Sequence, residues 1–315
     1  MKQIVTKNFL LIVLVLAVVF AFVKKATIFQ KQPDPKPKPA DTLSAAFTSY
    51  WFSGKAELNK YQLKQAKNGA LNAGEAMLIF MSEDFRTDKQ VKAESKDNAL
   101  PVLKTTSSKK FSTGVYEYSL LTSVFTPINN PLFPNTLKVS LSDQEWDGHS
   151  YLQANYRNNG YQVSGKSYYE KEADENYTIA KAMFEDELWN RIRLNPDKLP
   201  TGEIQLIPGT MAARLRHKSL QPLAAKATLA EYEGVLFPGM YLKSYTIEYP
   251  TDDRTLIIIF EKLFPHKIVG WEETYDTKDN LLTSRAVLKK TSQLDYWNHK
   301  APADSVLRNQ LLSTL

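Results

Sequence analysis

Residues 137–170 read LKVSLSDQEWDGHSYLQANYRNNGYQVSGKSYYE, and this stretch decides the fold class. Apolar and polar residues alternate along three runs, 137–145, 149–157 and 161–170, as they do in strands with one buried face. The dipeptides Asp147-Gly148 and Asn159-Gly160 separate the runs. Both are favoured in tight hairpin turns, so the stretch predicts an antiparallel meander of three strands.

The C-terminal part of the chain repeats this pattern. Alternating runs at 240–249, 254–264, 267–275 and 281–291 are separated by turn-forming residues. Residues 256–260 are apolar on both faces, which predicts a central strand that is covered on both sides. Three earlier runs predict further strands, at 56–67, 75–85 and 115–126.

Helices are predicted to be fewer. Residues 175–194 carry Ile179, Met183, Leu188 and Ile192 at helical spacing, and Asn195-Pro196 ends the pattern. Shorter helices are expected at 42–51 and 302–312. The sequence therefore predicts a mainly β (α+β) domain, built as a large curved antiparallel sheet or a partly open barrel with one long inserted helix.

The N-terminal region has a different composition. FLLIVLVLAVVFAFV, residues 9–23, has no charge in 15 residues, and as a helix it would extend about 22 Å against a bilayer core of about 30 Å. The small-x-small cleavage pattern that should follow a signal peptide is poor here, so we favour an uncleaved signal anchor over a cleaved peptide. Four prolines then alternate with other residues between Pro33 and Pro39, which is typical of a stiff spacer.

These features divide the chain into an anchor (1–29), a proline-rich linker (30–41) and a β-rich extracytoplasmic domain (42–315). We expect a single-pass protein of the cytoplasmic (inner) membrane whose main domain is periplasmic. The alternative is a periplasmic or secreted protein that is released by signal cleavage.

Charge and cysteine content exclude several classes of site. The chain has a net charge of +6, but residues 1–41 supply +5 of it through seven lysines and two aspartates. The remaining 33 basic and 32 acidic residues nearly cancel, so the domain lacks the net basic charge expected of a nucleic-acid binder. The absence of cysteine excludes disulfides, zinc–thiolate sites, iron–sulfur clusters and cysteine nucleophiles.

Catalytic motifs are also absent from the sequence. It has no Walker A pattern, no G-x-G-x-x-G after a strand, no G-x-S-x-G and no H-E-x-x-H. None of the four histidines has a second histidine at metal-ligand spacing. We therefore expect no metal and no cofactor, and we favour a non-enzymatic protein; a hydrolase whose site assembles only in the folded chain is the alternative.

Aromatic residues give the best indication of a ligand site. Flat rings offer contact area at low entropic cost, and aromatic side chains often line ligand cavities. Glu273 and Tyr275 lie two residues apart on one predicted strand and therefore share a face, where they can bind a polar headgroup or form a cross-strand pair. The candidate ligand-binding residues are Trp51, Trp146, Trp271, Glu273, Tyr275 and Trp297. Ordinary core packing is the alternative role for the aromatic members of this set.

Residues 50–85, YWFSGKAELNKYQLKQAKNGALNAGEAMLIFMSEDF, carry a family resemblance together with FEK, GWEETY, LLTSRAVLKKT and the closing LDYWNHK. They resemble an uncharacterised family of Bacteroidota envelope proteins whose members often bear the label "septum formation inhibitor Maf". True Maf proteins are cytosolic nucleotide pyrophosphatases with an S-x-S-P-R-R motif. This sequence lacks that motif, so no Maf residue or activity carries over.

The anchor, the β-rich domain and the aromatic content lead to one expectation. The chain is a membrane-anchored envelope protein whose domain binds a lipid-like or other apolar ligand, or a protein partner. The alternative of a different class is a structural or interaction protein of the envelope or septum that has a filled core and no ligand cavity.

Overall fold

The computed structural model describes residues 42–277 and 280–312, which belong to one compact unit, Ala40–Leu315. The predicted anchor (1–29) and linker (30–41) lie outside the described residues. No helix in the described part of the chain is long and apolar enough to cross a membrane.

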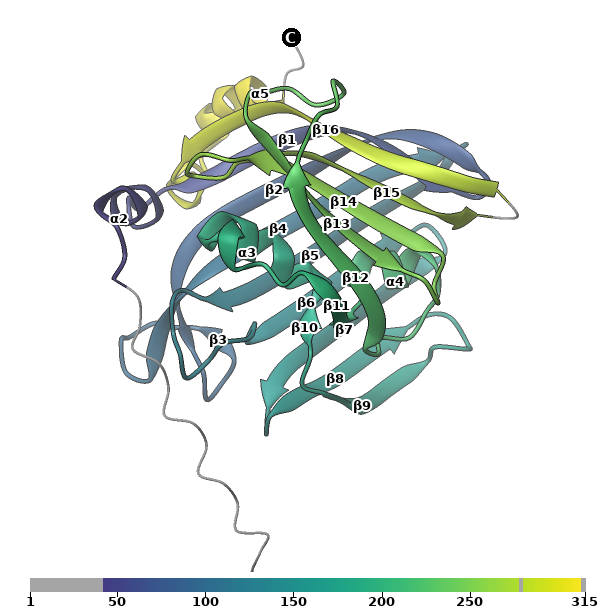
Figure 1. The fold of residues 1–315 in the computed structure, drawn as a ribbon, viewed down its shortest axis with the longest axis horizontal. Helices are drawn as coiled ribbons and strands as arrows, with labels where there is room; N and C mark the ends of the chain where they lie inside the picture. The colour runs from purple at the N-terminus through teal and green to yellow at the C-terminus, as the bar shows by residue number, and fades with distance from the viewer. Residues whose placement is uncertain (1–41, 278–279, 313–315) are drawn as a thin grey trace, which may run out of the picture. The chain divides into compact units, whose positions relative to one another are not determined.

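One large sheet of 16 strands forms the body of this unit and curves around two short helices, α3 and α4 (Figure 1). In chain order the strands are β1 (Ala56–Lys67), β2 (Ala70–Arg86), β3 (Val91–Lys92), β4 (Ala99–Thr113), β5 (Tyr116–Pro127), β6 (Lys138–Glu145), β7 (Gly148–Arg157), β8 (Gly160–Ser167), β9 (Asp174–Ala180), β10 (Met183–Phe184), β11 (Gly202–Ile207), β12 (Leu223–Glu231), β13 (Leu242–Tyr249), β14 (Arg254–Glu261), β15 (Ile268–Thr277) and β16 (Asn280–Leu294). Their order in the sheet is β10-β11-β12-β13-β14-β15-β16-β1-β2-β4-β5-β6-β7-β8-β9, with β3 paired to β2. Neighbouring strands are antiparallel except for β10 and β11, which are parallel, so the sheet is mixed.

The two edges of the sheet are consecutive in the chain. Only Lys181 and Ala182 separate β9 from β10, although these strands stand at opposite ends of the strand order. The sheet therefore rolls up until its edges approach each other, and residues from both edges, among them Ile179 and Phe184, share one apolar cluster. Among the described strands no pairing joins β9 to β10, so the barrel is not closed.

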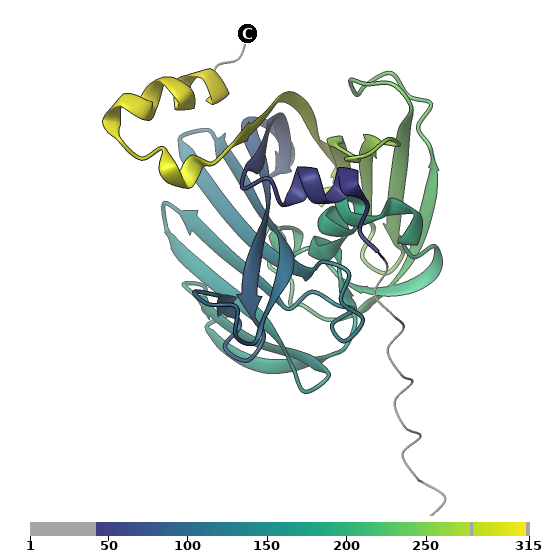
Figure 2. The same cartoon turned by 90° about the vertical axis from the view of Figure 1, so that its left-hand side faces the viewer.

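The helices are short: α2 (Ala45–Trp51), α3 (Glu185–Leu194), α4 (Thr210–Leu215) and α5 (Ser305–Leu312), with 3₁₀ turns η1 (Pro196–Lys198), η2 (Tyr296–Asn298) and η3 (Pro302–Asp304). The N-terminal helix α2 lies beside α3 (Figure 2), and the Arg193 guanidinium is 5.0 Å from the Trp51 ring centroid. At the other end of the chain, Trp297 and Leu311 pack on an apolar cluster that contains Leu58 and Met81.

Most predicted strands are confirmed, and so is the mainly β class with a large curved sheet. The strand at 256–260 is covered on both sides, because Ile258 belongs to the main core and Ile259 packs beneath Phe237 on the opposite face. Both predicted turns are displaced by one residue. Trp146 and Asp147 form the first, between the paired residues Glu145 and Gly148. Asn158 and Asn159 form the second, with φ of 49° and 61°, between the paired residues Arg157 and Gly160.

The single long helix predicted at 175–194 is wrong. Residues 174–180 form β9, and only 185–194 are helical. Tyr177 and Ile179 alternate at a period of two, and Tyr177 pairs with Val163 of β8. Pairing with a neighbouring strand therefore overrides a spacing of apolar residues that also fits a helix.

Seven of the ten residues of helix α3 are buried, although six of the ten are polar or charged. Nothing in the sequence indicates this burial, because an acidic run such as 185–187 is typical of a solvated face. Each buried polar side chain has a partner on another element: for example, Asn190 donates to the Leu103 carbonyl (3.0 Å) and Arg193 forms a bidentate pair with Glu57 of β1 (2.5 and 2.6 Å). The helix thus ties together strands that are distant in the sequence.

Candidate functional site

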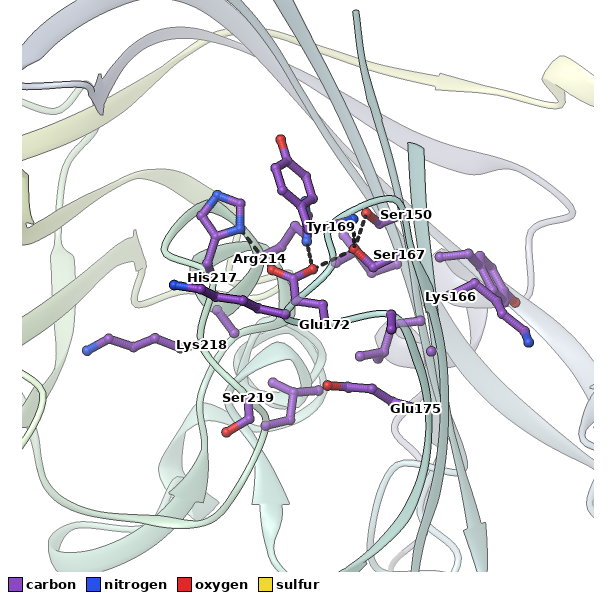
Figure 3. A pocket seen from close by; sticks show the side chains of 18 of the residues that line it. Ser150, Lys166, Ser167, Tyr169, Glu172, Glu175, Arg214, His217, Lys218 and Ser219 are labelled. Atoms are coloured by element: carbon purple, nitrogen blue, oxygen red, sulfur yellow. Dashed lines mark hydrogen bonds and ion pairs between the residues drawn. The ribbon is translucent and has the colours of Figure 1, made fainter. Parts of the chain in front are cut away.

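A cavity of about 730 Å³ lies between strands β6–β9 on one side and α4 with the segment after it on the other (Figure 3). The cavity lies next to the place where the two edges of the sheet approach each other. One edge strand is β9, and α4 follows β11, which is the neighbour of the other edge strand, β10. A volume of this size is in the range of about 300–1,000 Å³ that holds drug-sized ligands.

Much of the cavity wall is apolar. Leu141 of β6, Leu152 of β7, Ala213 of α4 and Leu220 of the following segment line it, together with the ring of Tyr177 on the edge strand β9. The strand residues among them face the cavity because alternate residues of a strand share one face. The wall can therefore accept an apolar body such as a hydrocarbon chain or a ring system.

Arg214 is the most buried of the charged residues that line the cavity. Its side chain is only 8% exposed; Nε donates to Asp143 (2.7 Å), Nη1 contacts Glu172, and the guanidinium lies 4.8 Å from the Tyr169 ring centroid. Its Nη2 lies 3.9 Å from Glu145 and has no hydrogen-bond partner among the described residues. A buried N–H without an acceptor is costly, so a bound molecule that supplies an acceptor here would be stabilised.

The acidic groups around Arg214 outnumber it. Burial raises the pKa of Asp143 to about 6, and the neighbouring Glu145 adds to this rise, while the hydrogen bond from Arg214 opposes it. Burial would also raise the pKa of Glu172, but hydrogen bonds from Ser167 and His217 and the charge of Arg214 lower it. One guanidinium therefore faces three carboxyl groups, and this excess of acidic groups disfavours a bound ligand that carries a full negative charge.

Ser167, Glu172 and His217 meet at the mouth of this site, but in an order that does not form a catalytic triad. Glu172 lies between the other two: it accepts from Ser167 Oγ (2.7 Å) and contacts His217 Nδ1 (2.8 Å) (Figure 3). In a Ser-His-Asp triad the imidazole lies next to the serine hydroxyl, so that it can take the proton. Here the carboxylate occupies that place.

A second polar cluster lies deeper inside the curve of the sheet. Arg254 of β14 donates to both oxygens of Glu185 (2.6 Å each) and to Glu273 (2.7 Å), and Lys109 of β4 is 3.6 Å from Glu273. Burial would raise the pKa of Glu273, but the charges of Arg254 and Lys109 lower it to about 2. The cluster borders a cavity of only about 50 Å³, which has room for water but not for an organic ligand.

Asp186 joins this inner cluster to α4. Its carboxylate accepts from the backbone N–H and the hydroxyl of Thr210, each at 2.9 Å, and Thr210 begins α4 and also lines the large cavity. Burial raises the pKa of Asp186 to about 7, the nearby Glu185 adds to the rise, and the bonds from Thr210 oppose it. The position of α4, and with it Arg214, thus depends on a carboxyl group inside the core.

The six residues predicted from the sequence do not form one site. Trp51 and Trp271 are buried in the main core, and Trp297 packs on the small cluster around Leu58. Trp146, 64% exposed, lines an open depression beside Phe111 and Tyr118.

Glu273 and Tyr275 share a face of β15, as the sequence predicts, and both are buried. Glu273 is paired with Arg254 and Lys109 at the inner cavity, and Tyr275 donates to the Ala66 carbonyl and borders another surface depression. Neither lines the cavity of about 730 Å³.

No metal site is present in the described part of the chain: no group of three His, Asp or Glu residues is placed to hold an ion. His299 does contact two carboxylates, Asp295 (3.1 Å) and Asp304 (3.4 Å), but all three belong to one local segment around η2 and η3. These contacts raise the pKa of His299 and tie down the start of the C-terminal helix.

Sequence reasoning missed Arg214, although one signal for it exists. The buried face of 137–145 carries Leu137, Val139 and Leu141 and then continues into Asp143 and Glu145. Two carboxylates that continue an apolar face require a buried cation. The sequence does not predict which residue supplies that cation, because Arg214 lies 71 residues from Asp143 along the chain.

Comparison with known proteins gives little further information. No protein-family model and no curated protein matches the chain. The chain is similar to one solved structure, the beta-barrel-like protein of the domain of unknown function DUF1849 from Brucella abortus, with 9% sequence identity and a TM-score of 0.48 over 76% of this chain and 98% of that one.

Proposed function

We propose that the chain is a non-enzymatic binding protein whose cavity between β6–β9 and α4 holds a neutral amphipathic molecule. The observation that carries the proposal is the buried Arg214 in the lining of a cavity of about 730 Å³, with an Nη2 that has no hydrogen-bond partner among the residues that the structure describes. The apolar residues on the same wall support a ligand that is lipid-like over most of its surface.

The polar group of this ligand is an acceptor without a full negative charge. Arg214 already faces Asp143, Glu145 and Glu172, so a carboxylate or phosphate would meet more repulsion than attraction. Two of the three lysines that line the cavity form ion pairs with carboxylates outside its lining, Lys166 with Asp174 and Lys218 with Asp252. An ester, amide or ketone carbonyl accepts from Nη2 without adding charge, which favours esters and other neutral lipids.

The setting of this activity is part of the proposal. The apolar run 9–23 and the proline-rich spacer after it support a tethered protein with its domain outside the cytoplasmic membrane, in the uncharacterised Bacteroidota envelope family that residues 50–85 resemble.

Photolabelling of the full-length protein in mild detergent tests the cavity. The probes are a clickable, photoactivatable fatty-acyl ester and the corresponding free fatty acid, and labelled peptides are mapped by mass spectrometry. We expect the ester to label 150–177 and 213–220 more strongly than the acid does. Ser219→Trp, at an exposed position that lines the cavity, should reduce labelling about ten-fold if the indole occupies the ligand's place.

Ser95→Trp is the matched control, because Ser95 is exposed and lies in a turn between β3 and β4. It should label like the wild type. Labelling spread over the whole domain, or labelling that Ser219→Trp leaves unchanged, would contradict the proposal.

A further inference from the structure

Large apolar side chains are exposed together on two neighbouring turns of the domain. In the β12–β13 connection Val235 is 94% and Met240 79% exposed, and in the β14–β15 turn Leu263 is 66% exposed. The full set, called the turn patch below, is Val235, Leu236, Met240, Tyr241, Leu263 and Phe264. Apolar residues gathered in this way mark an interaction surface more often than isolated ones do.

The turn patch is one surface because its two turns are joined. The Lys262 N–H donates to the Tyr241 carbonyl (2.9 Å), which continues the pairing of Leu242 with Glu261. The longer connection is held in place from below, since Phe237 is buried against Ile259 and Val269. A Cβ on Gly270 would lie 2.3 Å from the Phe237 ring, so the glycine makes room for this anchor. The exposed residues therefore project from a fixed base.

The turn patch lies beside the first helix of the described chain. The Phe264 ring is 6.3 Å from that of Phe47 and 5.6 Å from that of Tyr50, both in α2. Phe52, at the end of α2, adds a further exposed ring. The chain that precedes the domain thus joins it next to the turn patch.

The sequence that precedes α2 indicates what covers this surface. It contains the uncharged run 9–23 and the 12-residue linker 30–41, which spans at most about 37 Å at roughly 3.1 Å per extended residue. A tether of this length holds the patch at a high local concentration near whatever membrane contains residues 9–23. Aliphatic side chains with a tyrosine among them suit the interfacial region of a bilayer.

We infer that the turn patch docks on the surface of the lipid bilayer in which residues 9–23 are anchored. Two lysines next to the apolar tips are paired with carboxylates, Lys262 with Glu231 and Lys267 with Glu261, which reduces the charge brought to the bilayer surface. The inference rests on the tether in the proposed function, and it is independent of the cavity.

Single-cysteine labelling tests the inference on the full chain, which has no native cysteine. Met240→Cys and Leu263→Cys carry an environment-sensitive fluorophore, and the protein is reconstituted in vesicles of phosphatidylethanolamine and phosphatidylglycerol that contain nitroxide-labelled acyl chains. Val115→Cys is the control, because Val115 is 82% exposed and the strand registers place it at the end of the sheet opposite to the 262–267 turn.

We expect the nitroxide lipids to quench the probes at 240 and 263 at least about two-fold more than the probe at 115. Equal quenching at the three positions in a chain that floats with the vesicles would overturn the docking and leave the tether intact. A probe that becomes shielded only as the protein concentration rises at constant lipid would instead assign the patch to a second copy, which also overturns the inference. A chain that does not float refutes both tether and docking, whereas the cavity is judged separately by photolabelling.

Discussion

Replacement of Asp186 by asparagine should stabilise the protein at neutral and alkaline pH. The carboxyl group is buried where α3 meets α4, and burial raises its pKa from 3.8 to about 7. In the unfolded chain the group ionises near its ordinary pKa, so between about pH 4 and pH 7 the folded state binds more protons than the unfolded state. The free energy of unfolding therefore falls as the pH rises through this window.

The size of the effect follows from the pKa difference. A rise of about three pH units corresponds to at most about 4 kcal/mol, at about 1.4 kcal/mol for each unit. Asparagine is neutral at every pH; its oxygen can accept from the Thr210 N–H, and its amide can donate to the Thr210 hydroxyl, as a protonated aspartate would. Asp186→Asn should thus be more stable than the wild type by about 2–4 kcal/mol near pH 8 and equal to it within about 1 kcal/mol near pH 4.

Urea unfolding of the full-length protein in mild detergent, followed by tryptophan fluorescence at several pH values, measures this difference. Asp97→Asn, at an exposed position, should change stability by less than about 0.5 kcal/mol at either pH. The reasoning is refuted if Asp186→Asn is the less stable protein near pH 8 and shows the same pH slope as the wild type.

Three other substitutions test the core that positions the cavity. Arg193→Met should cost about 3–5 kcal/mol near pH 7, because it leaves Glu57 buried without its bidentate partner; a loss below about 1 kcal/mol in urea unfolding would contradict this. Glu273→Gln should cost about 2–4 kcal/mol near pH 7, since Arg254 and Lys109 hold the pKa of Glu273 at about 2. This deficit should shrink as the pH falls from about 4.5 toward 2, where the folded wild type also becomes protonated, and a deficit independent of pH would count against the ion pairing. Gly270→Ala should cost about 1–3 kcal/mol, because its Cβ would lie 2.3 Å from Phe237 and 2.4 Å from the Ala286 carbonyl. Gly165→Ala, whose nearest neighbour would be at 3.6 Å, is its control and should fold with near wild-type stability.

The strands were predictable because their signal is local. Alternation along 137–145 and 149–157 and the turn residues between them specify hairpins without reference to the rest of the chain. The local pattern gave a wrong prediction at 174–180, because Ile179 has helical spacing to Met183 and also strand spacing to Tyr177. Only the pairing of Tyr177 with Val163 decides between the two, and that pairing is a property of the folded sheet.

The candidate site was less predictable because its polar groups come from distant segments. The tryptophans were predicted to contact a ligand, yet Trp51 and Trp271 pack in the main core. The carboxylates of β6 indicate a missing cation, but only the fold brings Arg214 to them. Likewise the acidic start of α3 resembles a solvated face until Arg254 and Thr210 are placed against it.

The central claim is that the cavity beside Arg214 holds a neutral amphipathic molecule, and the native mass of the full-length protein tests it most directly. The protein would be extracted from membranes in mild detergent, and its mass measured first under native and then under denaturing conditions. We predict a native excess that matches a neutral lipid-like molecule, disappears on denaturation, is lost in Ser219→Trp and is retained in Ser95→Trp. A wild-type protein without any excess mass, or an excess that Ser219→Trp leaves unchanged, would contradict the account.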